Sequence, residues 1–144
     1  MTLVQIWFTR DHLCDDKAKS MPFEYLTARL CSIGHALRGV GLLVRGEPNA
    51  RIHALATVLV ILAGTLFHLS LIEWGLIVIA IACVWAVEAL NTAIEALVDL
   101  ISPERRSLAG KVKDIAAGAV LITACASVVI GLLVFVPYLL GLFK

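Results

Sequence analysis

The stretch that decides the fold is residues 115–143, IAAGAVLITACASVVIGLLVFVPYLLGLF, because none of its 29 residues is charged. A helix needs about 20 apolar residues to cross a bilayer, so this run is long enough by itself. A chain of 144 residues builds one domain, which has no core large enough to hide such a run. We therefore predict a membrane-spanning helix here.

Two further apolar runs precede this stretch. Residues 52–72 contain no Asp, Glu, Lys or Arg, which is long enough for a second span. Residues 74–87 are too few to span unless the helix continues past Glu88 to about residue 101, which places Glu88 at membrane depth. We predict spans at about residues 49–71, 72–101 and 111–141.

Residues 22–46 have a different pattern. Apolar side chains recur at spacings of three and four, on one helical stripe: Leu26, Leu30, Ile33, Leu37, Val40 and Val44. Arg29, Arg38 and Arg45 lie largely off that stripe, as in helices that lie in the membrane interface. The prediction is an all-α membrane protein, a bundle of three transmembrane helices plus an N-terminal amphipathic surface helix. It makes residues 22–144 one membrane domain and residues 1–21 a poorly ordered extension.

The composition agrees with a bilayer as solvent. Hydrophobic residues make up 60% of the chain, charged residues 16%, and the mean hydropathy is +0.95. The net charge of +1 argues against a nucleic-acid binder. The four cysteines form no C-x-x-C pair, which argues against a zinc site or a disulfide scaffold.

Basic residues near the predicted spans set the expected orientation. Lys144 and a short turn at residues 69–73 lie on one side, and seven basic residues lie on the other: Arg38, Arg45, Arg51, Arg105, Arg106, Lys111 and Lys113. Loops rich in Lys and Arg stay in the cytoplasm. We expect a cytoplasmic amino terminus and an external carboxyl terminus.

The polar residues of the second span lie along one helix face. At about 100° per residue, Glu88, Asn91, Glu95 and Asp99 project within a sector of roughly 80° over three turns. Acidic side chains within a membrane span are costly and mark functional sites. Clustered carboxylates repel one another unless a cation shares them, which suggests either Mg²⁺ with a phosphorylated ligand or a proton relay.

Two cytoplasmic segments add cations at the same level. Residues 47–53 contribute Arg51, and residues 102–114 contribute Arg105, Arg106, Lys111 and Lys113. His53, beside Arg51, has equal weight as a site residue and as an interface residue. Acids for a metal together with cations for phosphates are what phosphoryl transfer requires. The usual nucleotide-binding loops are absent, so ATP would have to bind at helix ends and loops.

Two rival functions remain open at this stage. A small proton-coupled transporter would also use acids on one face of a span, although it has no need of a basic loop beside them. An accessory membrane subunit would need only helix faces with small residues, and leaves Glu88, Asn91 and Glu95 unexplained.

Residues from about 28 to 133 resemble the small bacterial integral-membrane lipid kinases, the diacylglycerol kinase and undecaprenol kinase family. The resemblance rests on Glu88-x-x-Asn91-Thr-Ala-Ile-Glu95-x-x-Val-Asp99, on the following Lys113-Asp114, and on the Glu47-x-x-x-Arg51 pair. It implies a homotrimer in the bacterial inner membrane, with active sites between neighbouring subunits at the cytoplasmic surface. The implied reaction is phosphorylation of a lipid alcohol by ATP with Mg²⁺, and the alcohol is diacylglycerol or undecaprenol.

The resemblance also implies roles for individual residues of the second span and its neighbours. Glu88 corresponds to the general base that takes the proton of the lipid hydroxyl. Glu47 and Glu95 correspond to the Mg²⁺ ligands, and Asn91 to a group that orders Glu88 and the phosphates.

A second set of residues corresponds to nucleotide contacts. Lys113 matches the cation on the β- and γ-phosphates, and Asp114 matches a residue that holds the nucleotide. Asp99 and Arg51 are expected at the site, and Arg29 of the surface helix is a further candidate nucleotide contact.

Overall fold

The computed structural model describes residues 22–102, 104 and 106–141, and this part of the chain is helical with no strand. Four helices follow one another: α2 (Pro22–Gly46), α3 (Pro48–Leu66), α4 (Leu71–Ile101) and α5 (Ser107–Gly141). The chain divides into two compact units, residues Met1–Leu42 and Leu43–Lys144. The first contains most of α2, and the second contains the bundle of α3, α4 and α5.

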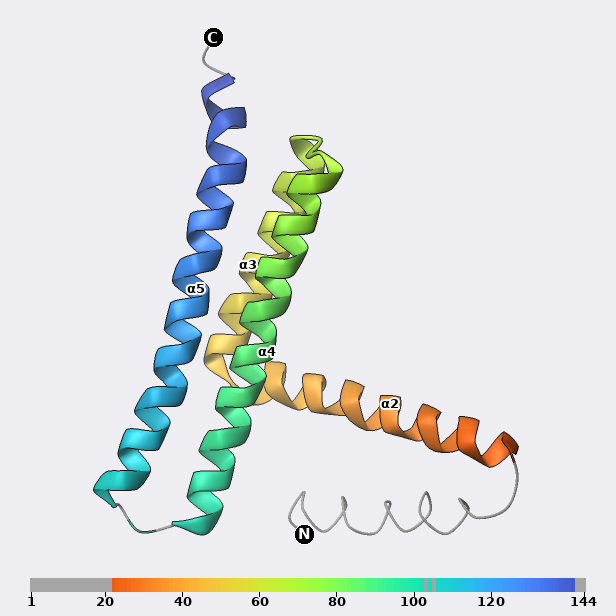
Figure 1. The fold of residues 1–144 in the computed structure, drawn as a ribbon, viewed down its shortest axis with the longest axis vertical. Helices are drawn as coiled ribbons and strands as arrows, with labels where there is room; N and C mark the ends of the chain where they lie inside the picture. The colour runs from red at the N-terminus through yellow and green to blue at the C-terminus, as the bar shows by residue number, and fades with distance from the viewer. Residues whose placement is uncertain (1–21, 103, 105, 142–144) are drawn as a thin grey trace. The chain divides into compact units, whose positions relative to one another are not determined.

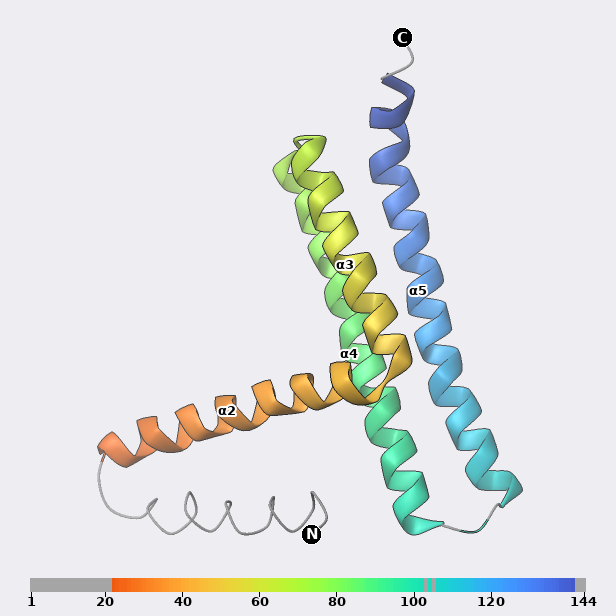
Figure 2. The same cartoon turned by 180° about the vertical axis from the view of Figure 1, so that it is seen from behind.

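In the bundle, α3 and α4 form an antiparallel hairpin, and α5 runs alongside it (Figure 1). Helix α3 lies behind α4 in Figure 1 and in front of it in Figure 2, with α5 beside both. All three helices are long and apolar enough to cross a membrane. Most of their large apolar side chains face outward, as suits contact with lipid. The protein is therefore a multi-pass membrane protein, and the predicted all-α fold with three apolar spans is confirmed.

The turn between α3 and α4 sets the end of the first span. His68 has a φ of 52°, its N–H donates to Thr65 O, and Leu69 N–H donates to Gly64 O. Those two bonds form a Schellman motif, which ends a helix with one residue in the left-handed region. The helix therefore stops at Leu66 instead of reaching residue 71, because the chain turns here although its side chains stay apolar.

The beginnings of α3 and α4 follow from local sequence. Pro48 occupies the first turn of α3, where its missing N–H leaves no hydrogen bond unmade. Ser70 caps α4 by accepting from Glu73 N, and the Glu73 carboxylate accepts from Ser70 N at 2.7 Å. This reciprocal capping box satisfies backbone donors at the start of α4.

The apolar core lies near the α3–α4 turn. Leu69, Ile77 and Val134 are buried together, and partly buried Phe67 and Trp74 pack against them. At the same end of the bundle, the Tyr138 hydroxyl donates to Glu73 Oε2 at 2.7 Å and links α5 to α4. The opposite end, near the α4–α5 loop, carries polar side chains such as Asp99, Arg106 and Lys113.

The remaining helices begin and end close to where the sequence places them. Helix α2 covers residues 22–46, α4 begins at Leu71, and α5 begins at Ser107, four residues before the expected start of the third span at residue 111. The predicted extension at residues 1–21 lies outside the described residues.

Candidate active site

The polar stripe of α4 runs from the bundle interior to its surface. Glu88 and Asn91 are buried, Glu95 is half-buried, and Asp99 is exposed. Residues three and four apart share a helix face, so the sequence spacing itself produces this gradient once α4 packs against its neighbours. The stripe therefore has a buried end at Glu88 and an exposed end at Asp99.

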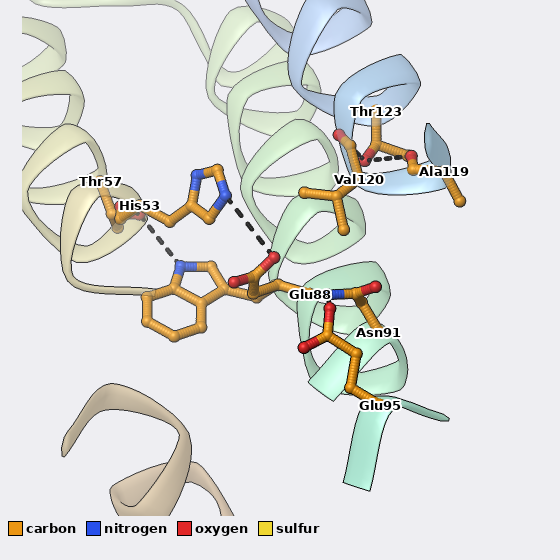
Figure 3. A network of polar contacts seen from close by, with 9 residues as sticks. His53, Thr57, Glu88, Asn91, Glu95, Ala119, Val120 and Thr123 are labelled. Carbon is orange, nitrogen blue, oxygen red and sulfur yellow. Dashed lines mark hydrogen bonds and ion pairs between the residues drawn. The ribbon is translucent and has the colours of Figure 1, made fainter. Parts of the chain in front are cut away.

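Glu88 is the large side chain that is fully buried among the described residues, at 1% exposure. Its Oε2 lies 4.0 Å from His53 Nε2 on α3 and has no hydrogen-bond partner in the described part of the chain. Figure 3 shows the carboxylate between the imidazole of His53 and the side chains of Asn91 and Glu95. A buried carboxylate without a hydrogen bond is costly, which is typical of a group kept for chemistry.

Asn91 connects Glu88 to the next acid of the stripe. Its Nδ2 donates to Glu95 Oε1 at 2.9 Å, so the amide fixes the Glu95 carboxylate one turn along α4. Within the described residues the Asn91 Oδ1 atom is buried without a partner, as is Thr92 Oγ1. Glu88 Oε2 and Asn91 Oδ1 are thus two oxygen atoms of the α4 stripe without a hydrogen-bond partner among the described residues.

A polar cavity of about 300 Å³ opens beside this stripe. Asn49 and His53 line it from α3, Asn91 and Glu95 from α4, and apolar residues of α3 and α5 complete the lining. An apolar cavity of about 250 Å³ is lined by His53, Thr57, Trp85 and apolar residues of all three helices. His53 lines both cavities.

Glu47 also belongs to this end of the bundle. It precedes α3 at the N-cap position, yet its side chain makes no capping hydrogen bond. Glu47, Glu95 and His53 are all close enough to act electrostatically on Glu88. Three of the predicted site acids are thereby brought together.

Asp99 and Lys113 form a separate ion pair at the exposed end of the stripe. Lys113 Nζ contacts Asp99 Oδ1 at 2.5 Å and joins α4 to α5. Both side chains line a third cavity, of about 290 Å³, together with Ser102, Arg106 and Gly110. Exposed ion pairs contribute about 0–1 kcal/mol, so Lys113 can exchange Asp99 for a phosphate at little cost.

Two predicted site residues of the bundle, Arg51 and Asp114, are not gathered with these groups. Arg51 donates from Nη2 to Arg45 O at 2.5 Å and from Nε to Val44 O at 3.2 Å. Its guanidinium thus satisfies carbonyls at the end of α2. Asp114 is exposed on α5, and Arg29 is exposed on α2 in the other unit.

The sequence did not reveal every polar group of the site. The sequence alone does not decide whether His53 is a site residue or an interface residue. The hydrogen bond from Trp85 Nε1 to Thr57 Oγ1, at 3.1 Å, was also unforeseen. No sequence signal could have found the His53–Glu88 approach or the Thr57–Trp85 bond, because each pair joins residues far apart in sequence.

The chain was compared with known proteins. Residues 34–135 match the prokaryotic diacylglycerol kinase family. The chain is 46% identical to an undecaprenol kinase of Bacillus subtilis, over 75% of this chain and 88% of that protein. It is 40% identical to a diacylglycerol kinase of Synechocystis, over 78% of this chain and 65% of that protein. It is 31% identical to a diacylglycerol kinase of Escherichia coli, over 67% of this chain and 79% of that protein.

The match covers the polar stripe of α4, the α4–α5 loop and most of α5. It favours neither the proton-coupled transporter nor the accessory subunit. The chain therefore belongs to the prokaryotic diacylglycerol kinase family and is a lipid kinase.

Proposed function

We propose that this lipid kinase transfers the γ-phosphoryl group of ATP to the hydroxyl of a membrane lipid alcohol, with Glu88 as general base. The observation that carries the proposal is the buried Glu88 carboxylate, whose Oε2 has no hydrogen-bond partner among the described residues. A carboxylate in such a place can accept a proton from a nearby hydroxyl as that hydroxyl becomes a nucleophile.

In the proposed reaction the proton of the lipid hydroxyl passes to the Glu88 carboxylate. The hydroxyl oxygen forms a bond to the γ-phosphorus while the bond from that phosphorus to the β–γ bridging oxygen breaks. ADP leaves with the electron pair, and Glu88 later releases its proton to solvent. Phosphoryl transfer depends mostly on positioning and electrostatics, so a few well-held groups are sufficient.

The acids around Glu88 fit a magnesium ion. The described residues contain no group of three or more His, Cys, Asp or Glu side chains that could hold a metal ion. Magnesium usually takes one or two carboxylates and completes its shell with water and substrate phosphates. Glu47, which makes no capping bond, and Glu95, which Asn91 orients, would supply those carboxylates. When bound, the ion would neutralise charge on the phosphate oxygens.

We assign nucleotide binding to charged residues near Asp99, at the exposed end of the stripe. Lys113 would turn from Asp99 towards the β- and γ-phosphates, and Asp114 would contact the nucleotide. Arg51 and Arg29 complete the proposed set. The bonds of Arg51 to carbonyls of α2 support an indirect role, in which it holds the segment that carries Glu47.

We propose undecaprenol, in preference to diacylglycerol, as the acceptor. The support is the 46% identity to an undecaprenol kinase over 88% of that protein, against 40% and 31% for two diacylglycerol kinases. The catalytic groups do not discriminate between the two alcohols, because each presents one hydroxyl at the membrane surface.

The proposal places the protein in a bacterial inner membrane as a homotrimer, with the active site on the cytoplasmic side. Small residues on α5 support association, since Ala117 and Ala119 are exposed and Gly118 has no atom within 4 Å of where a Cβ would be. Such faces let membrane helices approach closely.

The test is an assay of the purified chain in detergent micelles with Mg²⁺ and ATP. Undecaprenol and diacylglycerol are supplied side by side at equal mole fraction, and phosphorylated lipid is measured. Faster phosphorylation of undecaprenol supports the full proposal, and faster phosphorylation of diacylglycerol overturns the acceptor assignment. Absence of product with any lipid alcohol overturns the lipid kinase proposal.

A further inference from the structure

His53 faces Glu88 Oε2, a buried oxygen for which the described residues supply no hydrogen bond. The imidazole Nε2 is 4.0 Å from Glu88 Oε2, and the two side chains are 18% and 1% exposed. This separation is longer than a hydrogen bond, but catalytic contacts often tighten only when substrate is bound. The His53 Nε2 and Glu88 Oε2 atoms can therefore approach to hydrogen-bond distance when substrate binds.

A second contact, one turn away, holds the two helices in this register. Trp85 Nε1 donates to Thr57 Oγ1, and the Thr57 hydroxyl donates to the His53 carbonyl oxygen at 2.7 Å. Thr57 lies four residues after His53 on α3, and Glu88 lies three residues after Trp85 on α4. Antiparallel helices that meet at one pair bring the other pair together, because residues three and four apart share a face.

A hydrogen-bond donor on the His53 side would stabilise the Glu88 carboxylate, because its charged neighbours include two acids. Glu47 and Glu95 both bear on Glu88 as like charges, and Asn91 directs its amide donor to Glu95. From α5, the polar cavity is lined by Ala117, Val120, Leu121 and Ala124, which offer no donor. His53 presents a ring nitrogen 4.0 Å from Glu88 Oε2, on the side where α5 offers no donor.

We propose that His53 is a positioning residue for the kinase reaction, an inference that rests on the proposed role of Glu88 as general base. Its Nε2–H donates to Glu88 Oε2 in the substrate complex and turns the other carboxylate oxygen towards the lipid hydroxyl. His53 also lines both the polar and the apolar cavity.

A purely structural role for His53 predicts a different outcome, so substitutions separate the two. His53→Leu keeps the bulk and removes the donor, whereas His53→Gln keeps an N–H donor close to the position of Nε2. Misplacing a reacting group by about 1 Å costs roughly 100-fold in rate, so we expect His53→Leu to lower kcat by about 10- to 100-fold. The KM for ATP should stay within about 2-fold, because the nucleotide contacts are not altered.

The decisive comparison is between the two substitutions. We expect His53→Gln to recover kcat to within about 5-fold of the original chain, since the donor is restored. The melting temperature of each variant is measured in the same micelles, and His53→Ala serves as a second variant without a donor. Equal loss of kcat in the Gln and Leu variants, or a loss that appears only in the KM for ATP, overturns the positioning role.

Glu88→Gln is assayed in parallel so that the failures can be told apart. No product from the unaltered chain overturns the proposed function itself. Product from the unaltered chain and from Glu88→Gln at equal rates overturns the base assignment. An inactive Glu88→Gln beside a fully active His53→Leu overturns only the inference about His53.

Discussion

At the scale of single residues, Glu88 combines full burial with an oxygen that the described residues leave without a hydrogen bond. Substituting Gln keeps its shape but removes proton acceptance. Lipid phosphorylation should then fall by at least about 100-fold, the usual size of a general-base contribution. ATP affinity and turnover measured on one purified variant test this.

The fold should survive Glu88→Gln. Burying an unpaired charge destabilises a protein, so the amide should leave the melting temperature unchanged or raised. Intact turnover with lost ATP binding would instead make Glu88 a metal ligand and move the base role to Asp99.

Glu95 gives the second prediction at this scale. Its Oε1 accepts from Asn91, an interaction that Gln can still make through its own Oε1. Glu95→Gln therefore removes one charge with little disturbance of geometry. Because a hard cation is held mainly by anionic oxygens, we expect a steep rise in the Mg²⁺ concentration needed for half-maximal activity. An unchanged magnesium dependence contradicts the ligand assignment.

At the scale of elements, the close approach of α3 to α4 depends on Gly64. A Cβ built on Gly64 would lie 2.8 Å from Trp74 Cη2 and 3.1 Å from Leu69 Cδ1. Trp74 packs against the core cluster and Leu69 belongs to it, so neither can move freely. We expect Gly64→Ala to lower the stability of the bundle by about 1–3 kcal/mol, as overpacking does elsewhere.

Gly75, on the other helix of the α3–α4 hairpin, offers a matched control. It lies in the first turns of α4, and a Cβ there would meet no atom within 4 Å. Gly75→Ala should be neutral or stabilising by up to about 1 kcal/mol, because Ala is the better helix former. Thermal unfolding of both variants in the same detergent measures the contrast, and equal melting temperatures refute the packing argument.

At the scale of the whole molecule, we predict that the basic segment at residues 102–114, which comprises the α4–α5 loop and the start of α5, is cytoplasmic and the carboxyl terminus is not. The reason is the excess of Arg and Lys on the loop side, which membranes retain in the cytoplasm. Single cysteines at Ser107 and at Lys144 are introduced in a background that lacks the four native cysteines. A membrane-impermeant thiol reagent applied to intact cells should label the site at Lys144 alone. Labelling at Ser107 with none at Lys144 reverses the topology.

The sequence by itself determined which segments are helices and which side chains share a face. Helix periodicity is local, so the stripe from Glu88 to Asp99 follows from spacing, and apolar runs of sufficient length specify spans in a bilayer. The gradient from buried Glu88 to exposed Asp99 lies along the face that the spacing defines. The family followed from the same stripe and from Lys113-Asp114.

The tertiary structure decided which residues of different helices meet. The rotation and register of α3 against α4 depend on packing, so the approach of His53 to Glu88 and the bond between Thr57 and Trp85 could not be obtained from spacing. The end of α3 depended on a turn whose left-handed residue is His68, not the usual Gly, which left no sequence signal. The fold also decided which oxygen atoms the basic side chains contact, because a flexible basic side chain binds an oxygen that the fold brings near. Arg51 donates to carbonyls of α2, and Lys113 pairs with Asp99.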